Sequence, residues 1–283
     1  MAEPLSGTFD RDTGVQLLEH SQQELVFAGE VADGWRAGRG PHGGYLAAMI
    51  LRALVGSVND PLRTPRSLTI HFVRAPVPGS VTIRTVLERE GRSVSTLSAR
   101  MEQDGRLMAL ALSAFSVPWS GPAISEVPMP DVAPAEATRE SGTLIKDHGA
   151  PPFARHITLQ RRFGGLPFAG PEQPMETGGW IGLAEPRPID SLSLAFFCDA
   201  LVPAPFMRIA EPAPAPTIDL TVHFRQPMPR NPEPDPDELC LARVRSGVVH
   251  EGLFEEDVVI WATDGTVLAQ SRQLAILMPA PIG

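Results

Sequence analysis

The sequence predicts an α+β fold in which one β-rich unit, made of a strand, a helix and four antiparallel strands, occurs twice in tandem. Residues 68–79, LTIHFVRAPVPG, align without a gap on residues 220–231, LTVHFRQPMPRN, at an offset of 152 residues. An Asp-Gly pair then follows in each copy, at 104–105 and at 264–265. Asp-Gly between alternating strands is a strong hairpin signal. The repeat therefore predicts two antiparallel sheets, each wrapped round a central helix.

The elements of each copy follow from local patterns. A strand is expected near residues 24–31 and, in the second copy, near 154–163. The first helix is expected from 43 to 58, after two glycines. In the second copy Asp190 is a plausible helix N-cap and Pro203 a plausible stop. After each helix we expect strands, because apolar residues alternate with polar ones, and prolines mark where some of these strands end.

These patterns divide the chain into three parts. The first unit is expected to cover residues 1–118 and the second to cover residues 152–283. Residues 119–151 are rich in Pro, Ala, Ser and Glu and show little periodicity, which is typical of a linker.

Composition excludes several classes of function. The formal net charge of -9 argues against nucleic acid as a partner. The sequence shows no signal peptide and no apolar stretch near the ~20 residues of a membrane helix. Two cysteines do not make a disulfide framework, so a cytoplasmic protein is expected. No CxxC or HxxxH spacing occurs, so neither a metal nor a cofactor is expected.

A strand, a central helix and a four-strand meander resemble the hotdog fold, and two copies resemble the double-hotdog acyl-CoA thioesterases of the acyl-CoA thioesterase II type. No single motif is diagnostic, but their order and spacing are fairly specific. The motifs that carry the resemblance are GPHGGYLAAMILRAL at 40–54, IHFVRAP at 70–76, EREGRSVST at 88–96, DALVPA at 199–204, TIDLTVHFRQP at 217–227 and LAQSRQLAIL at 268–277.

The resemblance implies a site in which Asp199, Thr217 and Gln273 together orient a water molecule. In that family the glutamine is often followed by Glu-Gly, whereas Leu274-Ala275 follow Gln273 here. The departure weakens this last match but leaves the amide in place.

The residues themselves support part of this site. Asp199 continues the apolar stripe of its helix, and a carboxylate there is costly unless it has partners. The alternative is that the helix frays, so that Asp199 caps it or faces solvent. Thr217 is expected on the strand face of Asp219, opposite Leu220, and a threonine in a strand is common. Gln273 is expected on the more apolar face of its strand, where it either serves the site or satisfies backbone groups.

The repeat provides an internal control for these three residues. At the same offset, Ala47 and Pro65 stand where the second copy has Asp199 and Thr217. Across the Asp-Gly turn the offset is 160 residues, and Ser113 stands where the second copy has Gln273. A structural role would be expected in both copies, so the asymmetry favours a single functional site.

The first copy offers a different set of residues. His42, Gly43 and Gly44 precede a helix, where free N–H groups attract anions and could form an oxyanion hole. A glycine turn that allows tight packing is the alternative. Arg89 and Arg92 are candidates for binding nucleotide phosphates, although exposed arginines at a strand end are often only solvated.

The leading hypothesis is therefore hydrolysis of an acyl-CoA by a positioned water. No Ser or Cys lies in a nucleophile elbow, so no covalent acyl-enzyme is expected. A non-catalytic acyl-CoA-binding module and a hotdog enoyl-CoA hydratase are the alternatives; the hydratase needs a histidine beside its aspartate, and none is near Asp199 in the sequence. A homodimer or a higher homo-oligomer is possible.

Overall fold

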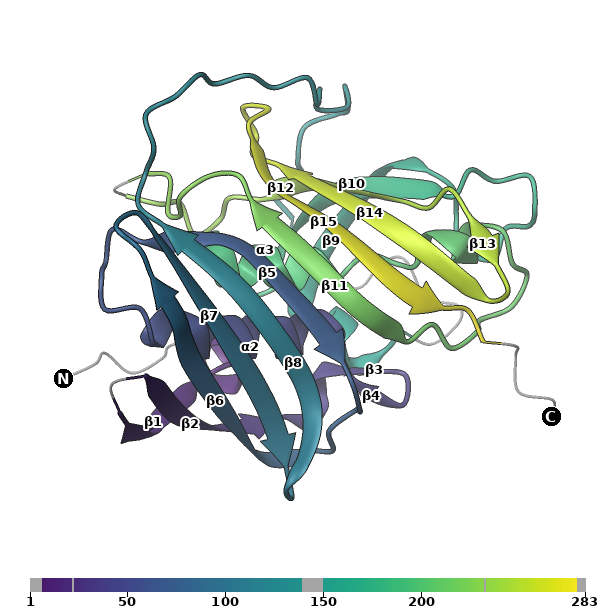
Figure 1. The fold of residues 1–283 in the computed structure, drawn as a ribbon. Coiled ribbons are helices and arrows are strands. Elements are labelled where there is room, and N and C mark those ends of the chain that lie inside the picture. The colour runs from purple at the N-terminus through teal and green to yellow at the C-terminus, as the bar shows by residue number, and fades with distance from the viewer. Residues whose placement is uncertain (1–6, 22, 139–149, 232, 279–283) are drawn as a thin grey trace.

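The computed structural model describes residues 7–21, 23–138, 150–231 and 233–278 (Figure 1). The first half of the chain holds helices α1 (Thr8–Asp12), η1 (Asp33–Trp35) and α2 (Gly43–Gly56) and strands β1 (Val15–His20), β2 (Glu24–Val31), β3 (Arg36–Ala37), β4 (Gly40–Pro41), β5 (Thr64–Phe72), β6 (Gly79–Glu90), β7 (Val94–Gln103) and β8 (Arg106–Ser116). The second half holds helices η3 (Pro152–His156), α3 (Ser191–Phe197) and η4 (Ala204–Met207) and strands β9 (Ile157–Gly164), β10 (Glu176–Leu183), β11 (Thr217–Phe224), β12 (Cys240–Arg245), β13 (Val249–His250), β14 (Leu253–Trp261) and β15 (Val267–Ile276).

The two predicted sheets are joined into one, which corrects the expectation of two separate sheets. Strands β5 and β11 pair antiparallel and connect the halves into a single 13-stranded sheet. Without this pairing, β5 and β11 would each be an exposed sheet edge with free backbone N–H and C=O groups. Pairing them satisfies the backbone groups of both strands. Thr69 lies opposite Thr221 with the hydroxyls 3.1 Å apart. Since these two residues are equivalent in the repeat, a pseudo-twofold axis passes between them.

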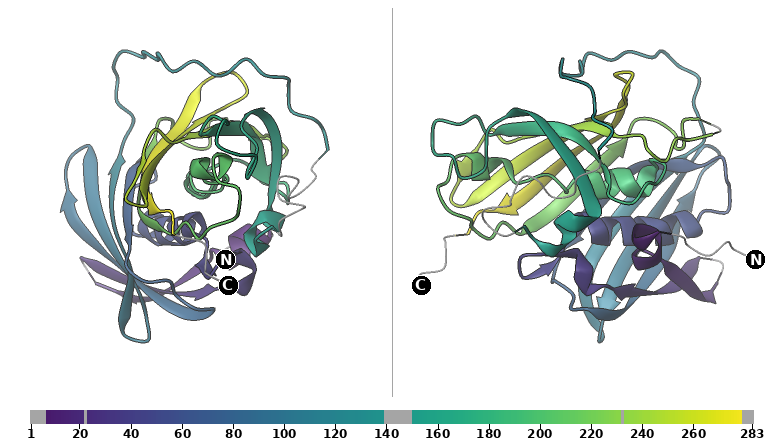
Figure 2. Two further views of the ribbon diagram at one scale, coloured as in Figure 1. Left: turned by 90° about the vertical axis from the view of Figure 1, so that its right-hand side faces the viewer. Right: turned by 180° about the vertical axis from the view of Figure 1, so that it is seen from behind.

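The helices lie on the inner side of the curved sheet. Helix α2 packs against β5, β6 and β7, and the second half of the sheet curves round α3 (Figure 2). The two helices also contact each other. One hydrophobic core runs through both halves, so the two copies form a single packed body.

The second helix begins where the sequence predicts and ends sooner. Asp190 is confirmed as the N-cap of α3: its side chain accepts the N–H of Ser193, whose hydroxyl in turn accepts the Asp190 N–H. Such a capping box stabilises a helix start. The helix stops at Phe197, well before Pro203. Its last turn continues as short turns to Asp199 and Ala200, and this brings the chain back toward α2.

Two of the longer strands, β1 and β10, were not expected from the sequence. Strand β1 has mostly exposed side chains, and β10 contains Gly178 and Gly179, so neither shows apolar alternation. In β10 a β-carbon on Gly179 would lie 2.2 Å from the carbonyl oxygen of Gln160 on β9. Only glycine therefore allows this close approach at the bulge between the strands.

The predicted linker carries neither helix nor strand over its described part, 119–138, and residues 139–149 lie outside the described residues. Residues 127–133 nevertheless pack on the second half of the sheet. The indole of Trp261 donates to the carbonyl of Val127 at 3.1 Å, and that of Trp180 donates to the carbonyl of Ala133 at 2.9 Å. The segment thus covers a second, smaller hydrophobic cluster. None of the helices in the described part of the chain is long and apolar enough to span a bilayer.

Candidate active site

Asp199 lies in the turn after α3, not on the helix as expected. Its backbone N–H donates to the carbonyl of Phe196 at 3.1 Å, and the hydroxyl of Ser271 on β15 donates to the carbonyl of Cys198 at 3.4 Å. These bonds hold the turn between α3 and the sheet. The carboxyl group is only 10% exposed, so the alternative in which Asp199 faces solvent is wrong.

The start of α2 provides the partners of this carboxyl group. The N–H of Gly44 donates to Oδ2 of Asp199 at 2.7 Å. His42 is the N-cap of α2: its Nδ1 accepts the N–H of Tyr45, so its Nε2 carries the proton and donates to the carbonyl of Asp199 at 2.9 Å. The same Nε2 lies 3.6 Å from Oδ2. The fold therefore places a histidine beside Asp199, which corrects the expectation drawn from the sequence separation.

Both glycines are required by this close contact. A β-carbon on Gly44 would lie 2.6 Å from the carbonyl oxygen of Phe196 and 3.1 Å from Cβ of Asp199. One on Gly43 would lie 2.8 Å from Oδ2 of Asp199. The tight-packing explanation of the glycine pair thus holds, and the Gly44 N–H is engaged by the carboxylate. Of the two predicted oxyanion donors, this leaves the N–H of Gly43.

A β-bulge brings Thr217 into the site. The register of β11 against β15 shifts between Thr217 and Asp219, so that Thr217 pairs with the buried Ala275. Thr217 therefore faces inward with Gln273, contrary to the expectation that it shares a face with Asp219. A bulge adds one residue to a strand and so reverses the direction of every side chain beyond it. The hydroxyl of Thr217 donates to Oε1 of Gln273 at 3.0 Å.

Gln273 connects the site to a carboxyl group that the sequence analysis missed. Its Nε2 donates to Oε2 of Glu256, which lies directly opposite on β14, at 2.5 Å. Gln273 also lies close enough to Asp199 to lower the pKa of that carboxyl group as a donor. Glu256 is 2% exposed. A signal was available, since Glu256 alternates with Phe254 and Val258 and so lies on the apolar face of its strand.

Burial controls the protonation of this cluster. Removal from water raises the pKa of Asp199, and the neighbouring His42, the Gly44 N–H and Gln273 oppose the rise. Burial raises the pKa of Glu256 to about 8, and the negative charge of Asp199 adds to the effect. Burial lowers the pKa of His42 and so favours its neutral imidazole, while the neighbouring Asp199 opposes this. Perturbed pKa values of this kind cluster at functional sites, and these two carboxyl groups lie on either side of one amide.

The structure does not bring Arg89 and Arg92 to this cluster. Arg89 lies near the end of β6 and Arg92 in the turn before β7, beside the end of β5 that holds Thr64, whereas the cluster lies at the Phe72 end. A strand of this length spans about 25 Å. Two other exposed arginines lie at the Phe72 end: Arg74 just after β5, and Arg39 between β3 and β4. The hairpin formed by β3 and β4 packs against the segment after β5, where Gly40 approaches Ala75.

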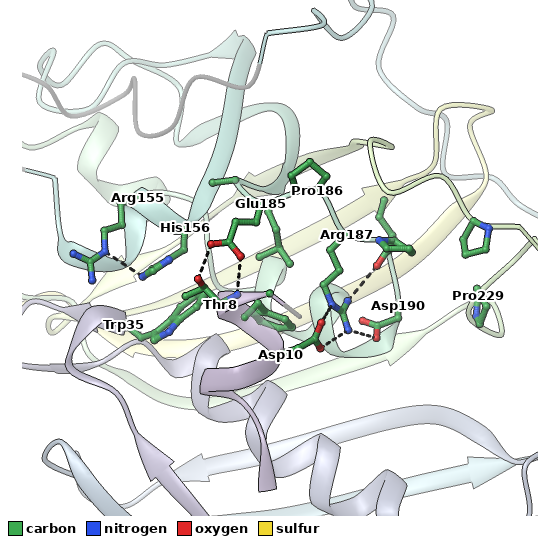
Figure 3. Close-up of a pocket in the computed structure, with 17 residues that line it drawn as sticks. Thr8, Asp10, Trp35, Arg155, His156, Glu185, Pro186, Arg187, Asp190 and Pro229 are labelled. Carbon is green, nitrogen blue, oxygen red and sulfur yellow. Dashed lines mark hydrogen bonds and ion pairs between the residues drawn. The ribbon is translucent and has the colours of Figure 1, made fainter. Parts of the chain in front are cut away.

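A pocket of about 470 Å³ opens elsewhere, between α1 and the connection from β10 to α3 (Figure 3). Two of its contacts join the two halves: Arg187, which also binds the nearby Asp190, binds Asp10 at 2.7 Å, and Glu185 accepts hydrogen bonds from Thr8. These pairs fix α1 to the second half. Asp199, Thr217 and Gln273 are not among the lining residues.

Two models of known protein families match the two halves of the chain. The model of the acyl-CoA thioesterase N-terminal domain matches residues 31–116, and that of the C-terminal domain matches residues 128–277. The chain belongs to the acyl-CoA thioesterase family. The second match begins inside the predicted linker, at the segment that packs on the second half of the sheet.

Relatives of this thioesterase family member agree over nearly the whole chain. An uncharacterized protein of Mycobacterium tuberculosis is 24% identical over 275 residues, covering 89% of this chain and 91% of its own. A hot dog fold protein of unknown function from Alicyclobacillus acidocaldarius has a TM-score of 0.83 at 25% identity, covering 97% and 99% of the two chains. A putative thioesterase II from Thermobifida fusca has a TM-score of 0.78 at 25% identity, covering 96% and 98%.

The acyl-CoA thioesterase II TesB2 of Mycobacterium marinum has a TM-score of 0.70 at 17% identity, covering 97% and 99% of the two chains. At this identity the likeness establishes the fold alone. It shows that the tandem hotdog architecture of this chain also occurs in an acyl-CoA thioesterase II.

Proposed function

We propose that the protein hydrolyses an acyl-CoA thioester by a water molecule that Asp199, Gln273 and Thr217 orient. The observation that carries the proposal is the buried carboxyl group of Asp199, held by the Gly44 N–H at 2.7 Å, with Gln273 close enough to lower its pKa. A carboxylate in this setting is a stronger base than an exposed one because burial raises its pKa.

The chemistry needs no covalent intermediate. Asp199 takes a proton from the water as the water oxygen attacks the thioester carbonyl carbon. The C–S bond then breaks, the thiolate of CoA takes up the proton, and the free acid leaves. The N–H of Gly43 at the start of α2 is suited to the developing oxyanion, since helix N-termini favour negative charge. A positioned base of this kind contributes about 10²–10⁴-fold in rate.

Two exposed arginines near the site are candidates for binding the nucleotide part of the substrate. Arg39 and Arg74 lie at the Phe72 end of β5, near the start of α2, and are exposed. Their guanidinium groups can bind phosphates bidentately. They replace Arg89 and Arg92 as the proposed phosphate ligands because of this location.

Replacing Asp199 with asparagine tests the proposal. The side chain keeps its shape and can still accept the Gly44 N–H, but it no longer takes a proton. We expect the loss of about 10²–10⁴-fold in kcat with acyl-CoAs of several chain lengths, measured by thiol release. Unchanged turnover in the folded variant would contradict the role of Asp199. Binding of acyl-CoA by the native protein without thiol release would instead favour the acyl-binding alternative.

The hydratase alternative is disfavoured by the state of His42. Both of its ring nitrogens are engaged by backbone groups of Tyr45 and Asp199. It is therefore not free to act on a substrate. Incubation with crotonyl-CoA should give no hydration product, and formation of a 3-hydroxyacyl-CoA would contradict this conclusion.

A further inference from the structure

Glu256 is a buried acid with no assigned role that contacts the proposed site directly. Its Oε1 accepts the N–H of Ala204 in η4, and its Oε2 accepts Nε2 of Gln273 at 2.5 Å. Both carboxyl oxygens thus have fixed partners, and one of them is the amide that also lowers the pKa of Asp199. An isolated buried carboxyl group is costly, so its presence calls for a role that an apolar residue could not fill.

The first copy shows that the fold does not need this acid. Ser113 is the equivalent of Gln273 across the Asp-Gly turn, and Leu97 lies opposite Ser113 on β7. Leu97 is fully buried, as is usual for an apolar residue at this position. The second copy therefore replaces a buried Leu–Ser pair with a buried Glu–Gln pair, at the place where the proposed site lies.

We propose that Glu256 is a positioning residue that sets which end of the Gln273 amide faces Thr217 and which faces Asp199. An amide has a donor end and an acceptor end, and its partners decide how it lies. The Thr217 hydroxyl can either donate or accept, so it cannot decide. A carboxylate only accepts, so ionised Glu256 requires the Nε2 end of Gln273 and leaves Oε1 for Thr217.

The protonation of Glu256 controls this choice. Once protonated, Oε2 becomes a donor and favours the Oε1 end of Gln273, so that the amide turns over and no longer donates to Asp199. The charged groups that act on Glu256 are Asp199 across the amide and Glu255 on the same strand, both negative. On β12, Arg245 pairs with Asp257 of β14, on the opposite face of the strand. Burial among these groups raises the pKa of Glu256 to about 8.

Kinetics of Glu256→Gln test the proposal, which deepens the proposed hydrolysis and rests on it for this readout. The new side chain must give its oxygen to the Ala204 N–H, so its NH₂ faces Gln273 as protonated Glu256 would. We expect kcat to fall about 10- to 100-fold above about pH 8, with KM little changed, as for other residues that orient a catalytic group. In the native protein kcat should rise with pH as Glu256 ionises near pH 8, and in the variant this rise, the upper ionisation of the profile, should be absent.

Glu255→Gln is the matched control, since it makes the same change one residue away on the opposite face of β14. It should keep the native kcat at high pH and an upper ionisation, moved slightly to lower pH because one of the negative charges that raise the pKa of Glu256 is gone. Glu256→Leu places the first copy's residue in the second copy and should also lose the upper ionisation. A native kcat in Glu256→Gln, or a uniformly lower kcat with the native pH profile, would overturn the proposal.

A readout without substrate separates this inference from the proposed function. The side-chain ¹⁵N amide signals of Gln273, assigned by their loss in Gln273→Leu, should titrate with pH in the native protein and in Glu255→Gln. They should not titrate in this way in Glu256→Gln. Failure of the native protein to release any thiol would contradict hydrolysis, whereas Gln273 signals independent of pH in the native protein would contradict the role of Glu256.

Discussion

Replacing Glu256 with glutamine should make the protein progressively more stable than the native chain as the pH rises from about 6 to about 9. The pKa of Glu256 is raised from its ordinary value of 4.5 to about 8 in the folded protein. Between these values the folded state retains a proton that the unfolded state releases. Stability from this group is therefore present at low pH and is lost as the pH rises toward 8.

The magnitude follows from the width of that window. Each pH unit between the two pKa values lowers the free energy of unfolding by about 1.4 kcal/mol. From pH 6 to pH 8 the native protein should lose about 3 kcal/mol relative to Glu256→Gln, and above pH 8 the difference should level off. Other titrating groups are common to both proteins, so they cancel in the difference.

Urea unfolding at several pH values measures this difference, with tryptophan fluorescence as the signal. Trp261 at the end of β14 is fully buried and reports on the same strand. Glu255→Gln, on the opposite face, should still lose stability as the pH rises, over a slightly narrower range because it removes one of the negative charges that raise the pKa of Glu256. A difference between the native protein and Glu256→Gln that is constant from pH 6 to pH 9 would refute the reasoning, because it would mean that Glu256 titrates as it does when unfolded.

Three further outcomes are expected. Gly44→Ala should lower the free energy of unfolding by about 1–3 kcal/mol because its β-carbon would lie 2.6 Å from the carbonyl oxygen of Phe196. Gly56→Ala on the same helix should change this free energy by less than about 1 kcal/mol, since the nearest atoms to its β-carbon lie at 3.4 Å, in the ring of Phe27. Thermal melting compares the two variants. Hydrolysis should be lost as the pH falls through the raised pKa of Asp199, so an acidic limb at the ordinary value of 3.8 would contradict its burial. Arg74→Ala should raise KM for acyl-CoA about 3- to 10-fold, more at low salt, with kcat unchanged, while Arg92→Ala should leave both parameters unchanged.

Much of the fold could be predicted because its signals are local. The repeat aligns residues 68–79 with 220–231 at an offset of 152, and the structure pairs the equivalent Thr69 and Thr221 across the axis between the halves. Asp190 was predicted as a helix N-cap from its position alone. A strand without alternation, such as the glycine-containing β10, has no local signal and was missed for that reason.

The site was predicted only as a set of residues. The internal control, in which Ala47, Pro65 and Ser113 stand in the first copy, separated Asp199 and Gln273 from ordinary polar residues. It could not show how they meet. Thr217 reaches Gln273 through a bulge, and a bulge depends on the register between two strands, which hydrophobic alternation does not encode.

By itself, the sequence determined that one unit is repeated and that Asp199, Thr217 and Gln273 of the second copy stand where the first copy has Ala47, Pro65 and Ser113. Periodicity and turn residues act over a few neighbours, so one chain suffices to detect them. Only the tertiary structure decided that the sheets join, that Gly44 and His42 hold Asp199, and that Glu256 holds Gln273. The contacts of Asp199 with Gly44 and His42 unite residues far apart in the chain, and the burial that raises the pKa of both carboxyl groups exists only in the packed structure.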